Sequence, residues 1–474
     1  MSAPAPAKPK KTFDRSIVEG PILTSVWKIA WPTVLQNVIG GLQGIIDHAM
    51  VGHYVGFNGN AAVGVAFQIF LVVIVFVMSI FTGMGVLVAR FAGAGDEHAV
   101  NRTVYQAYLA TLVLALGVFA PVGWFASPFL LDLVNAAPAV QVEAIAYLRT
   151  MFVGGIGMMS MFFLGGALRA AGDAKTGLQL GVAMTVLNVI LNIIFIRGLG
   201  PIPPMGVMGA ALGTVIAGVI VSAYGFSKLF SGKLVIHWEP DMDRRWDWTT
   251  VKQLFRFGLP AGLQGIAMNV AGVLLLRFMG SLQNSAETQA AYAVGYSELF
   301  SFITWTSVGL MGAAATVAGQ NLGAGKPERV ERTVQIASRL GLGIAVFIGL
   351  LFLTIPKLLL GVFGMDDPTV LRIGTELLRW LSLSGLFITV ALTYTGGLQG
   401  TGDTKGPLYI TLVSQIGVPL GLLMVLQLTR PLVPSDIWLA ILLGHMMRAT
   451  LSVRRFKAGA WRSIRIEAEP ARAG

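Results

Sequence analysis

The sequence has 474 residues, of which 55% are hydrophobic and only 12% are charged, and its mean hydropathy is +0.72. An average soluble domain carries about 25% charged residues, so this composition excludes a chain that covers itself with polar side chains in water. The net charge of +11 does not indicate a nucleic-acid partner, because the basic residues lie mainly between apolar blocks. No cysteine occurs, which excludes disulfides and thiolate metal sites. We therefore expect a protein of the lipid bilayer that has no bound cofactor.

The chain begins with residues 1–13, which are rich in Ala, Pro and Lys. They contain no apolar core followed by a small-residue cleavage site, so they do not form a secretory signal. We interpret them as disordered, and we assign residues 1–25 to a cytoplasmic N-terminal tail.

The apolar blocks that follow predict an all-α membrane protein with twelve transmembrane helices, since about 20 apolar residues span a bilayer. The first six are expected at 26–50, 61–89, 104–126, 144–169, 176–198 and 205–228. The second six are expected at 252–280, 289–318, 333–355, 369–398, 407–428 and 434–453.

The distribution of Lys and Arg predicts the orientation of these helices. With the N-terminus inside, the inner segments hold 20 basic residues, whereas the outer loops hold only Lys357 and Arg430. Positive charge collects on the cytoplasmic side of membrane proteins, so both termini should be cytoplasmic. We expect the protein in the bacterial inner membrane, as a monomer.

The chain divides into two similar halves. We assign 26–230 to an N-terminal six-helix lobe, 231–250 to a cytoplasmic linker, 251–455 to a C-terminal lobe and 456–474 to a C-terminal tail. Residues 88–107 and 318–337 share 8 identities in 20 at an offset of 230. Because each half has an even number of helices, the halves are parallel repeats. Transporters with repeats bind substrate between them and alternate access by moving one half against the other.

Positions where the halves differ are candidates for function. Asp47 lies in the first span, and its repeat mate is Leu275. Asn188 and Asn192 are four residues apart on one face of the fifth span, and their mates are Val418 and Leu422. A carboxylate with amide neighbours can bind a proton or a hard cation such as Na⁺. The alternative is a hydrogen-bonded cluster that only packs helices.

Glu298 is a second acid within a span, and its mate is Gln68. It could attract a cationic substrate, act as a second coupling site, or face a water-filled vestibule without a specific role. A candidate substrate or second coupling site therefore groups Glu298 with Gln36, Gln264, Asn269 and Tyr296.

Two Gly-Asp-x-Lys turns, at 172–175 and 402–405, are expected on the cytoplasmic side. Asp173 and Asp403 can each cap the following helix, because an N-cap carboxylate accepts free backbone N–H groups. We expect these turns to serve in capping or gating. Gly93-Ala-Gly95 and Gly323-Ala-Gly325 are typical of turns that end helices.

Several motifs together resemble the multidrug and toxic compound extrusion (MATE) family from about residue 20 to 455. They are Pro32 followed by Gly-Ile-Ile-Asp47-x4-Gly52, Gly93-Ala-Gly95, Pro138-x8-Tyr147-Leu-Arg149, Leu168-x3-Gly172-Asp173, Asn188-x3-Asn192 and Gly319-Gln-Asn-Leu-Gly-Ala-Gly325. The resemblance implies two six-helix lobes and efflux of cationic drugs against inward Na⁺ or H⁺. It also implies that Asp47, Asn188 and Asn192 form the coupling site.

The sequence departs from some bacterial branches of that family in the C-terminal half. Where those branches carry a glutamate in the seventh helix, this chain has Ala267-Met268-Asn269, and its tenth span offers only Glu376. A cation site in the N-terminal lobe is therefore favoured.

Two other classes of protein fit the sequence less well. A lipid-linked oligosaccharide flippase with the same architecture should line its cavity with several basic residues. Here Asp47 and Glu298 predict an acidic interior and hence a cationic cargo. A membrane-embedded enzyme should show a clustered nucleophile, metal ligands or an acid–base pair, and the sequence shows none of these.

Overall fold

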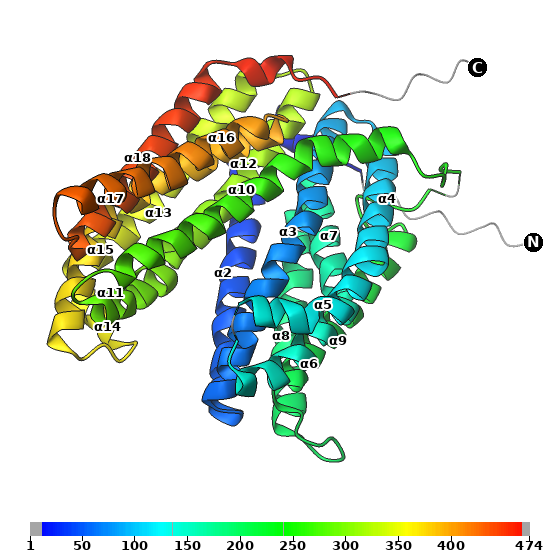
Figure 1. The fold of residues 1–474 in the computed structure, drawn as a ribbon. Helices are drawn as coiled ribbons and strands as arrows, with labels where there is room; N and C mark the ends of the chain where they lie inside the picture. The colour runs from blue at the N-terminus through cyan, green and yellow to red at the C-terminus, as the bar shows by residue number, and fades with distance from the viewer. Residues whose placement is uncertain (1–11, 135, 240, 467–474) are drawn as a thin grey trace, which may run out of the picture.

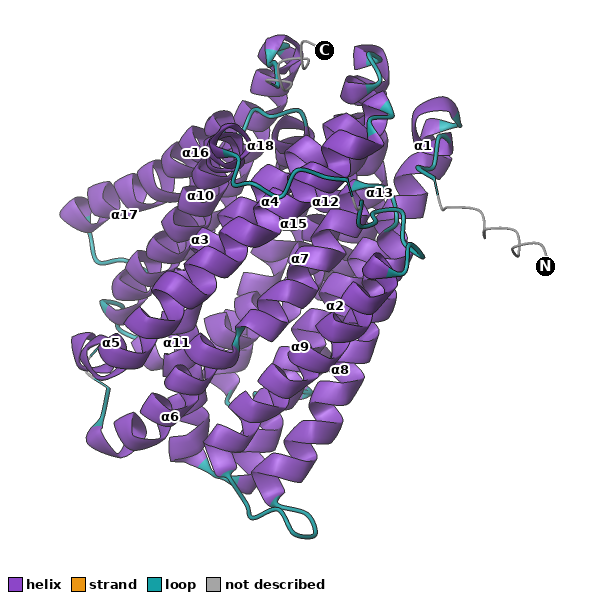
Figure 2. Ribbon diagram, turned by 90° about the vertical axis from the view of Figure 1, so that its right-hand side faces the viewer, coloured by secondary structure: helices purple, strands orange, loops and turns teal. Residues whose placement is uncertain are grey.

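The computed structural model describes residues 12–134, 136–239 and 241–466, and these residues form helices without any strand (Figures 1 and 2). Most of the tail predicted to be disordered, residues 1–13, lies outside the described residues. From Thr12 onwards the chain is placed against the lobes, and it includes the short helix α1 (Ser16–Glu19).

The first half supplies six spans, and two of them are interrupted, one by a π-helical turn and one by a bend at a glycine pair. They are α2 (Ile22–Tyr54), α3 (Phe57–Ala94), α4 (Glu97–Leu114) continued by η1 (Ala115–Phe119) and α5 (Ala120–Leu133), α6 (Pro138–Gly154) with α7 (Ile156–Ala170), α8 (Ala174–Arg197) and α9 (Gly206–Phe230). The α6–α7 pair is bent by 50° at Gly154 and Gly155. A glycine pair is one of the usual causes of such a kink.

The second half repeats this order. Its spans are α10 (Trp248–Gly280), α11 (Ser285–Tyr292) continued by η2 (Ala293–Leu299) and α12 (Ser301–Gly323), α13 (Pro327–Thr354), α15 (Pro368–Gly400), α16 (Lys405–Thr411) continued by η3 (Leu412–Gly417) and α17 (Val418–Thr429), and α18 (Pro434–Lys457). The short helices α14 (Pro356–Gly361) and η4 (Ala460–Ser463) follow α13 and α18.

Within the described residues, ten of these helices are long and apolar enough to cross a membrane, and the bent α6–α7 pair makes eleven. The 33-residue helix α2 is long enough to be the twelfth span. At the end of the molecule where the termini lie, most helices continue beyond their predicted boundaries. Glu97 to Thr103, for example, continue α4 as a polar helical turn that hydropathy alone had excluded.

The two halves meet at the end of the molecule that holds both termini and diverge towards the opposite end (Figure 1). Glycines let their helices touch there. A Cβ on Gly93 of α3 would lie 1.9 Å from the Gln320 carbonyl oxygen, and one on Gly323 of α12 would lie 2.0 Å from that of Arg90. Gly323 and Gln320 are the repeat mates of Gly93 and Arg90, so the same backbone contact is made twice across the pseudo-twofold axis.

Both terminal segments cross this junction. Ile17 of α1 is fully buried in a cluster that includes Ala174 of the first half and Val317 of the second. Arg329 of α13 donates to the Gly20 carbonyl at 2.7 Å. At the other terminus, Arg90 donates to the Ile464 carbonyl at 3.2 Å. Each terminal segment therefore joins its own half to the other one.

Candidate functional site

The predicted polar cluster of the first half is built from α2, α8 and α9. Asn192 Nδ2 of α8 donates to Asp47 Oδ1 of α2 at 2.8 Å and lies 3.4 Å from Asn188 Oδ1. Asn188 Nδ2 in turn donates to Thr214 Oγ1 of α9 at 2.9 Å. Both asparagines are fully buried, whereas Asp47 is half-buried. The structure thus brings together the three residues of the candidate coupling site.

One oxygen in this cluster lacks a partner. Asn192 Oδ1 is buried and accepts no hydrogen bond from any described residue. Gly213 of α9 leaves room for it, since a Cβ on Gly213 would lie 2.0 Å from this oxygen. A buried amide oxygen beside a carboxylate is a ligand for a hard cation, and carboxylate, amide and hydroxyl oxygens are the ligands such cations prefer.

The described residues contain no group of three or more His, Asp or Glu side chains that could hold a metal ion. A cation bound here would therefore be held by Asp47 together with neutral oxygens. Thr214 and Gly213 belong to this environment but were missed by the sequence analysis, because a threonine or glycine in a membrane helix carries no distinctive signal.

A central cavity lies between the two halves. It has a volume of about 380 Å³ and is lined by Gln36, Asn37 and Arg169 from the first half and by Met311, Thr316 and Gln399 from the second, among others. The predicted residue Gln36 is therefore part of this wall. Gln264 lies behind it, where its Oε1 accepts a hydrogen bond from Gln399 Nε2 at 3.1 Å and its Nε2 donates to Thr411 Oγ1 at 3.0 Å.

A second cavity of about 410 Å³ lies within the second half. Its lining includes Asn269, Tyr292, Tyr296, Gln415 and His445. Tyr296 stacks on Tyr292 with ring centroids 4.8 Å apart. The predicted residues Asn269 and Tyr296 thus share one cavity, but Gln36 and Gln264 are associated with the other. The structure separates the candidate second site into two places.

Glu298 lies in the π-helical turn η2 and is half-buried. Its carboxylate forms no hydrogen bond or ion pair with another described residue, and it lines neither of these two cavities. The predicted acidic interior is wrong for both cavities. No Asp or Glu is among the described residues that line them, whereas Arg169 lines the central cavity and the fully buried Arg448 lies 3.7 Å from Met268 in the wall of the second.

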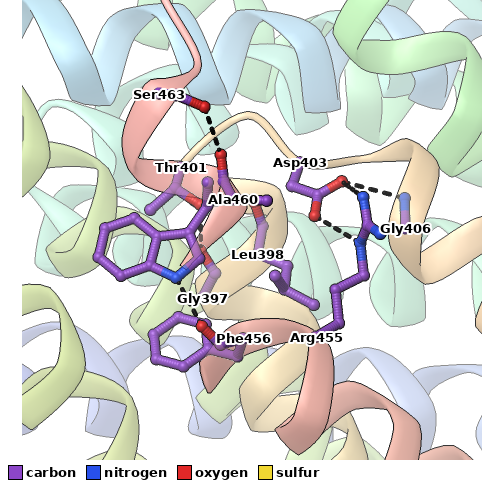
Figure 3. A network of polar contacts seen from close by, with 10 residues as sticks. Gly397, Leu398, Thr401, Asp403, Gly406, Arg455, Phe456, Ala460 and Ser463 are labelled. Carbon is purple, nitrogen blue, oxygen red and sulfur yellow. Dashed lines mark hydrogen bonds and ion pairs between the residues drawn. The ribbon is translucent and has the colours of Figure 1, made fainter. Parts of the chain in front are cut away.

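In each of the two Gly-Asp-x-Lys turns the aspartate accepts a hydrogen bond from the first turn of the following helix. Asp173 accepts a hydrogen bond from the Thr176 amide at 3.2 Å and from its hydroxyl at 2.9 Å. Asp403 accepts from the Gly406 amide at 3.1 Å and also from two nitrogens of Arg455, at 2.7 and 3.0 Å (Figure 3). The ion pair to α18 was not predicted, because Arg455 is far away in the sequence.

The comparison with known families agrees with this duplicated arrangement. The sequence model of the family described as MatE matches residues 32–194 and again residues 260–423. The chain belongs to the MatE family. The two matches start 228 residues apart, the offset that relates Pro32 to Pro260 in the predicted repeat.

The curated relatives of this MatE chain include two multidrug resistance proteins. A probable multidrug resistance protein NorM from Thermotoga maritima is 27% identical over 92% of each chain. The multidrug resistance protein MdtK from Edwardsiella ictaluri is 24% identical over 91% of this chain and 94% of its own length.

Solved structures show the same fold. One, described as the outward-facing conformation of a multidrug resistance MATE family transporter of the MOP superfamily, has a TM-score of 0.87 and 21% identity. The match covers 96% of this chain and 100% of the other. The predicted fold of twelve transmembrane helices in two lobes and the predicted family are therefore confirmed. As a MatE protein the chain is a membrane transporter and not an enzyme.

Proposed function

We propose that this MatE protein exports small-molecule drugs in exchange for inward H⁺ or Na⁺, with Asp47 as the main coupling carboxylate. The multidrug resistance proteins among its relatives support the class of cargo. For that cargo we propose amphipathic organic cations, as the family resemblance implies. Phe81 and Phe162 line the central cavity, and the faces of aromatic rings attract cationic groups.

The observation that carries the coupling proposal is the contact between Asp47 and Asn192. The carboxylate lies within a membrane-spanning helix and forms no ion pair with any described Lys or Arg. A charged carboxylate in such a position is costly. A bound proton or cation neutralises that charge, so the site favours binding of either one. Asn188, Thr214 and the free oxygen of Asn192 supply the neutral ligands that would share that cation.

Export then follows from alternating access between the lobes. The lobes meet at the end with the termini and diverge at the other, as in a transporter open on one side (Figure 1). We place that joined end in the cytoplasm, on the basis of the Lys and Arg distribution, and the protein in the bacterial inner membrane. We further propose that it acts as a monomer, since each chain contains both lobes.

The flippase alternative receives less support from the cavity. A pyrophosphate head group needs several cationic side chains, but Arg169 is the single Lys or Arg among the described residues that line the central cavity. The cavity volume of about 380 Å³ is also in the range typical of pockets for small molecules.

The test uses the purified protein in liposomes, with the pH gradient and the Na⁺ gradient imposed separately. Asp47→Asn should abolish gradient-driven drug transport, because the amide can neither bind a proton nor carry the negative charge that holds Na⁺. Asp132→Asn is the matched control, since Asp132 is exposed at the end of α5 and should leave transport unchanged. Normal transport by a correctly folded Asp47→Asn protein would rule out the coupling role.

A further inference from the structure

Arg169 lines the central cavity and has no polar partner in the part of the chain that the structure describes. It lies at the end of α7, lines the cavity, and forms no hydrogen bond or ion pair with any described residue. Its guanidinium reaches the second lobe, since a Cβ on Gly312 would lie 3.6 Å from Arg169 Nε. An arginine removed from bulk water is costly unless an anion or several acceptors compensate it.

The repeat shows that this charge breaks the symmetry of the cavity. The mate of Arg169 is Gln399, and the mate of Gln36 is Gln264. In the second lobe the two glutamines satisfy each other through the 3.1 Å hydrogen bond. In the first lobe neither Gln36 nor Arg169 has a polar partner among the described residues, although both line the cavity. The first lobe thus presents an unpaired amide and an unpaired guanidinium to the same space.

The remaining wall suits an organic ligand with one charged end. Met78, Phe81, Phe162 and Met311 supply apolar and aromatic surface, and no acidic side chain is among the described lining residues. A guanidinium holds planar oxyanions through two parallel hydrogen bonds, a geometry that an ammonium group cannot provide.

We infer that the central cavity binds an oxyanion, such as the carboxylate of an amphipathic substrate, against the guanidinium of Arg169. That the ligand is an exported substrate rests on the proposed function. Its class is then a zwitterion, an organic cation that also carries a carboxylate, with the apolar body between the two lobes. A lipid phosphate presents similar oxygen atoms, and it is the other source of the same chemistry.

Three probes that share one ring system test the inference: naphthoate, naphthylmethanol and naphthylmethylammonium. Their dissociation constants would be measured by equilibrium dialysis against the full-length protein in phosphatidylcholine nanodiscs. Naphthoate should bind about tenfold or more tightly than naphthylmethanol, because hydrogen bonds to a charged group are the stronger ones. Equal binding of these two probes would overturn the inference.

Substitutions then locate the effect. Arg169→Gln copies the residue of the second lobe and should abolish the preference for naphthoate, whereas Arg169→Lys should keep part of it. Arg149→Gln is the matched control, because its guanidinium donates to the Trp124 carbonyl at 3.0 Å and lies over that ring. An unchanged preference in folded Arg169→Gln contradicts the assignment.

If Arg169→Gln fails to fold, Gln36→Glu provides a second test. It places a carboxylate in the same cavity while Arg169 is kept, so the preference for naphthoate should be lost; a retained preference would exclude the site. Dialysis in dodecyl maltoside, a detergent without phosphate, with and without added phosphatidylglycerol distinguishes the two sources of oxyanion. Reduced naphthoate binding to the wild type, but not to Arg169→Gln, would identify the lipid phosphate as the competing ligand, and unchanged binding would identify the substrate carboxylate.

The failure of this inference can be separated from failure of the proposed function. Asp47→Asn should lose gradient-driven transport but should keep the preference for naphthoate, because dialysis measures binding at equilibrium without a gradient. A protein that transports normally without discriminating among the probes would refute only the role of Arg169.

Discussion

The free oxygen of Asn192 depends on the absence of a side chain at residue 213. A Cβ there would lie 2.0 Å from Asn192 Oδ1, far closer than any real contact, so Gly213→Ala must displace the amide. We expect this variant to weaken the hydrogen bond to Asp47 and to lower gradient-driven transport by about tenfold, the effect of losing one hydrogen bond to a charged group. Transport in liposomes at fixed drug concentration measures it.

The control for that variant is Gly44→Ala. Gly44 lies one turn before Asp47 on α2, and a Cβ there would meet nothing within 4 Å. It should therefore transport like the wild type. Equal rates for Gly213→Ala and the wild type would show that the position of Asn192 does not matter for coupling.

At this scale the sequence predicted the polar cluster but not its surroundings. The differences between Asp47 and Leu275 and between Asn192 and Leu422 were visible in the repeat, and these polar residues do meet in space. The same comparison contains Arg169 opposite Gln399. Arg169 was not singled out, because it lies at the very end of its predicted span, 144–169, and only the packing of the lobes shows that it faces a cavity.

Among the elements, the second duplicated turn is joined to another helix. Asp403 is buried, accepts a hydrogen bond from the Gly406 amide of its own turn, and binds Arg455 of α18 (Figure 3). Asp403→Ala should cost about 1–3 kcal/mol, because it removes hydrogen bonds to a charged partner as well as the bond to the backbone. Thermal unfolding in detergent would measure this loss.

The ion pair itself is assessed through Arg455→Gln, which leaves Asp403 with the Gly406 amide alone. Arg455 is 43% exposed, so solvent screens part of the interaction. A double-mutant cycle with Asp403→Asn should still give a coupling free energy that stabilises the folded protein. A coupling free energy of zero would mean that the ion pair does not stabilise this turn.

Acidic residues of the linker that follows α9 form hydrogen bonds with α4. Glu239 accepts hydrogen bonds from Asn101 at 2.6 Å and from His98 at 2.7 Å. Burial by itself raises the pKa of Glu239, but these hydrogen bonds outweigh it and hold the pKa below its ordinary value of 4.5. The pKa of Asp247 is lowered in the same way, by bonds from Thr250 and Thr249 and by the charge of Arg102.

This lowering predicts how the linker responds to pH. A carboxyl group with a lowered pKa in the folded state contributes stability above its unfolded pKa, and that stability is lost as the pH falls through the folded value. Amide hydrogen exchange of the linker, corrected for the intrinsic rate at each pH, should be constant above about pH 5 and should accelerate at lower pH. In Glu239→Gln the linker should exchange faster already at neutral pH, whereas the exposed Asp241→Asn should match the wild type. Exchange independent of pH down to pH 3 would contradict the proposed attachment.

The order and number of the helices could be predicted because each span must satisfy its backbone within one apolar segment. The attachment of the linker could not, since Glu239 and Asn101 are 138 residues apart and polar residues in a connection predict only exposure. The bend between α6 and α7 was likewise missed, because the hydropathy of residues 144–169 is continuous across the two glycines.

For the whole molecule, the lobes contact each other at residues with small side chains, and the terminal segments cover this contact. Gly93 and Gly323 bring α3 and α12 together, and Ile17 and Ile464 lie across the same end. Two closely packed rigid bodies joined at one end can exchange with a state in which that end is open. The parallel repeat predicted these two bodies, but the role of the terminal segments was hidden, because a polar N-terminal stretch is typical of a flexible tail.

The separation of the lobes at this end can be tested with cysteine pairs, since the chain has no native cysteine. A Cβ on Gly319 of α12 would lie 2.8 Å from the Cβ of Ala89 in α3 and equally close to the Gly400 carbonyl oxygen. A disulfide between Ala89→Cys and Gly319→Cys therefore requires these helices to move apart by about 1 Å. Once oxidised, it should stop transport, because the joined end can no longer open, and reduction should restore transport. The control pair, Ala291→Cys with Gly374→Cys, lies within the second lobe at a Cβ separation of 3.7 Å and should transport in both redox states. The comparison requires that the reduced pair between the lobes is active, which excludes a defect caused by the substitutions alone. Full turnover with the disulfide between the lobes complete would mean that the lobes do not separate at this end, and that substrate crosses the membrane by another motion.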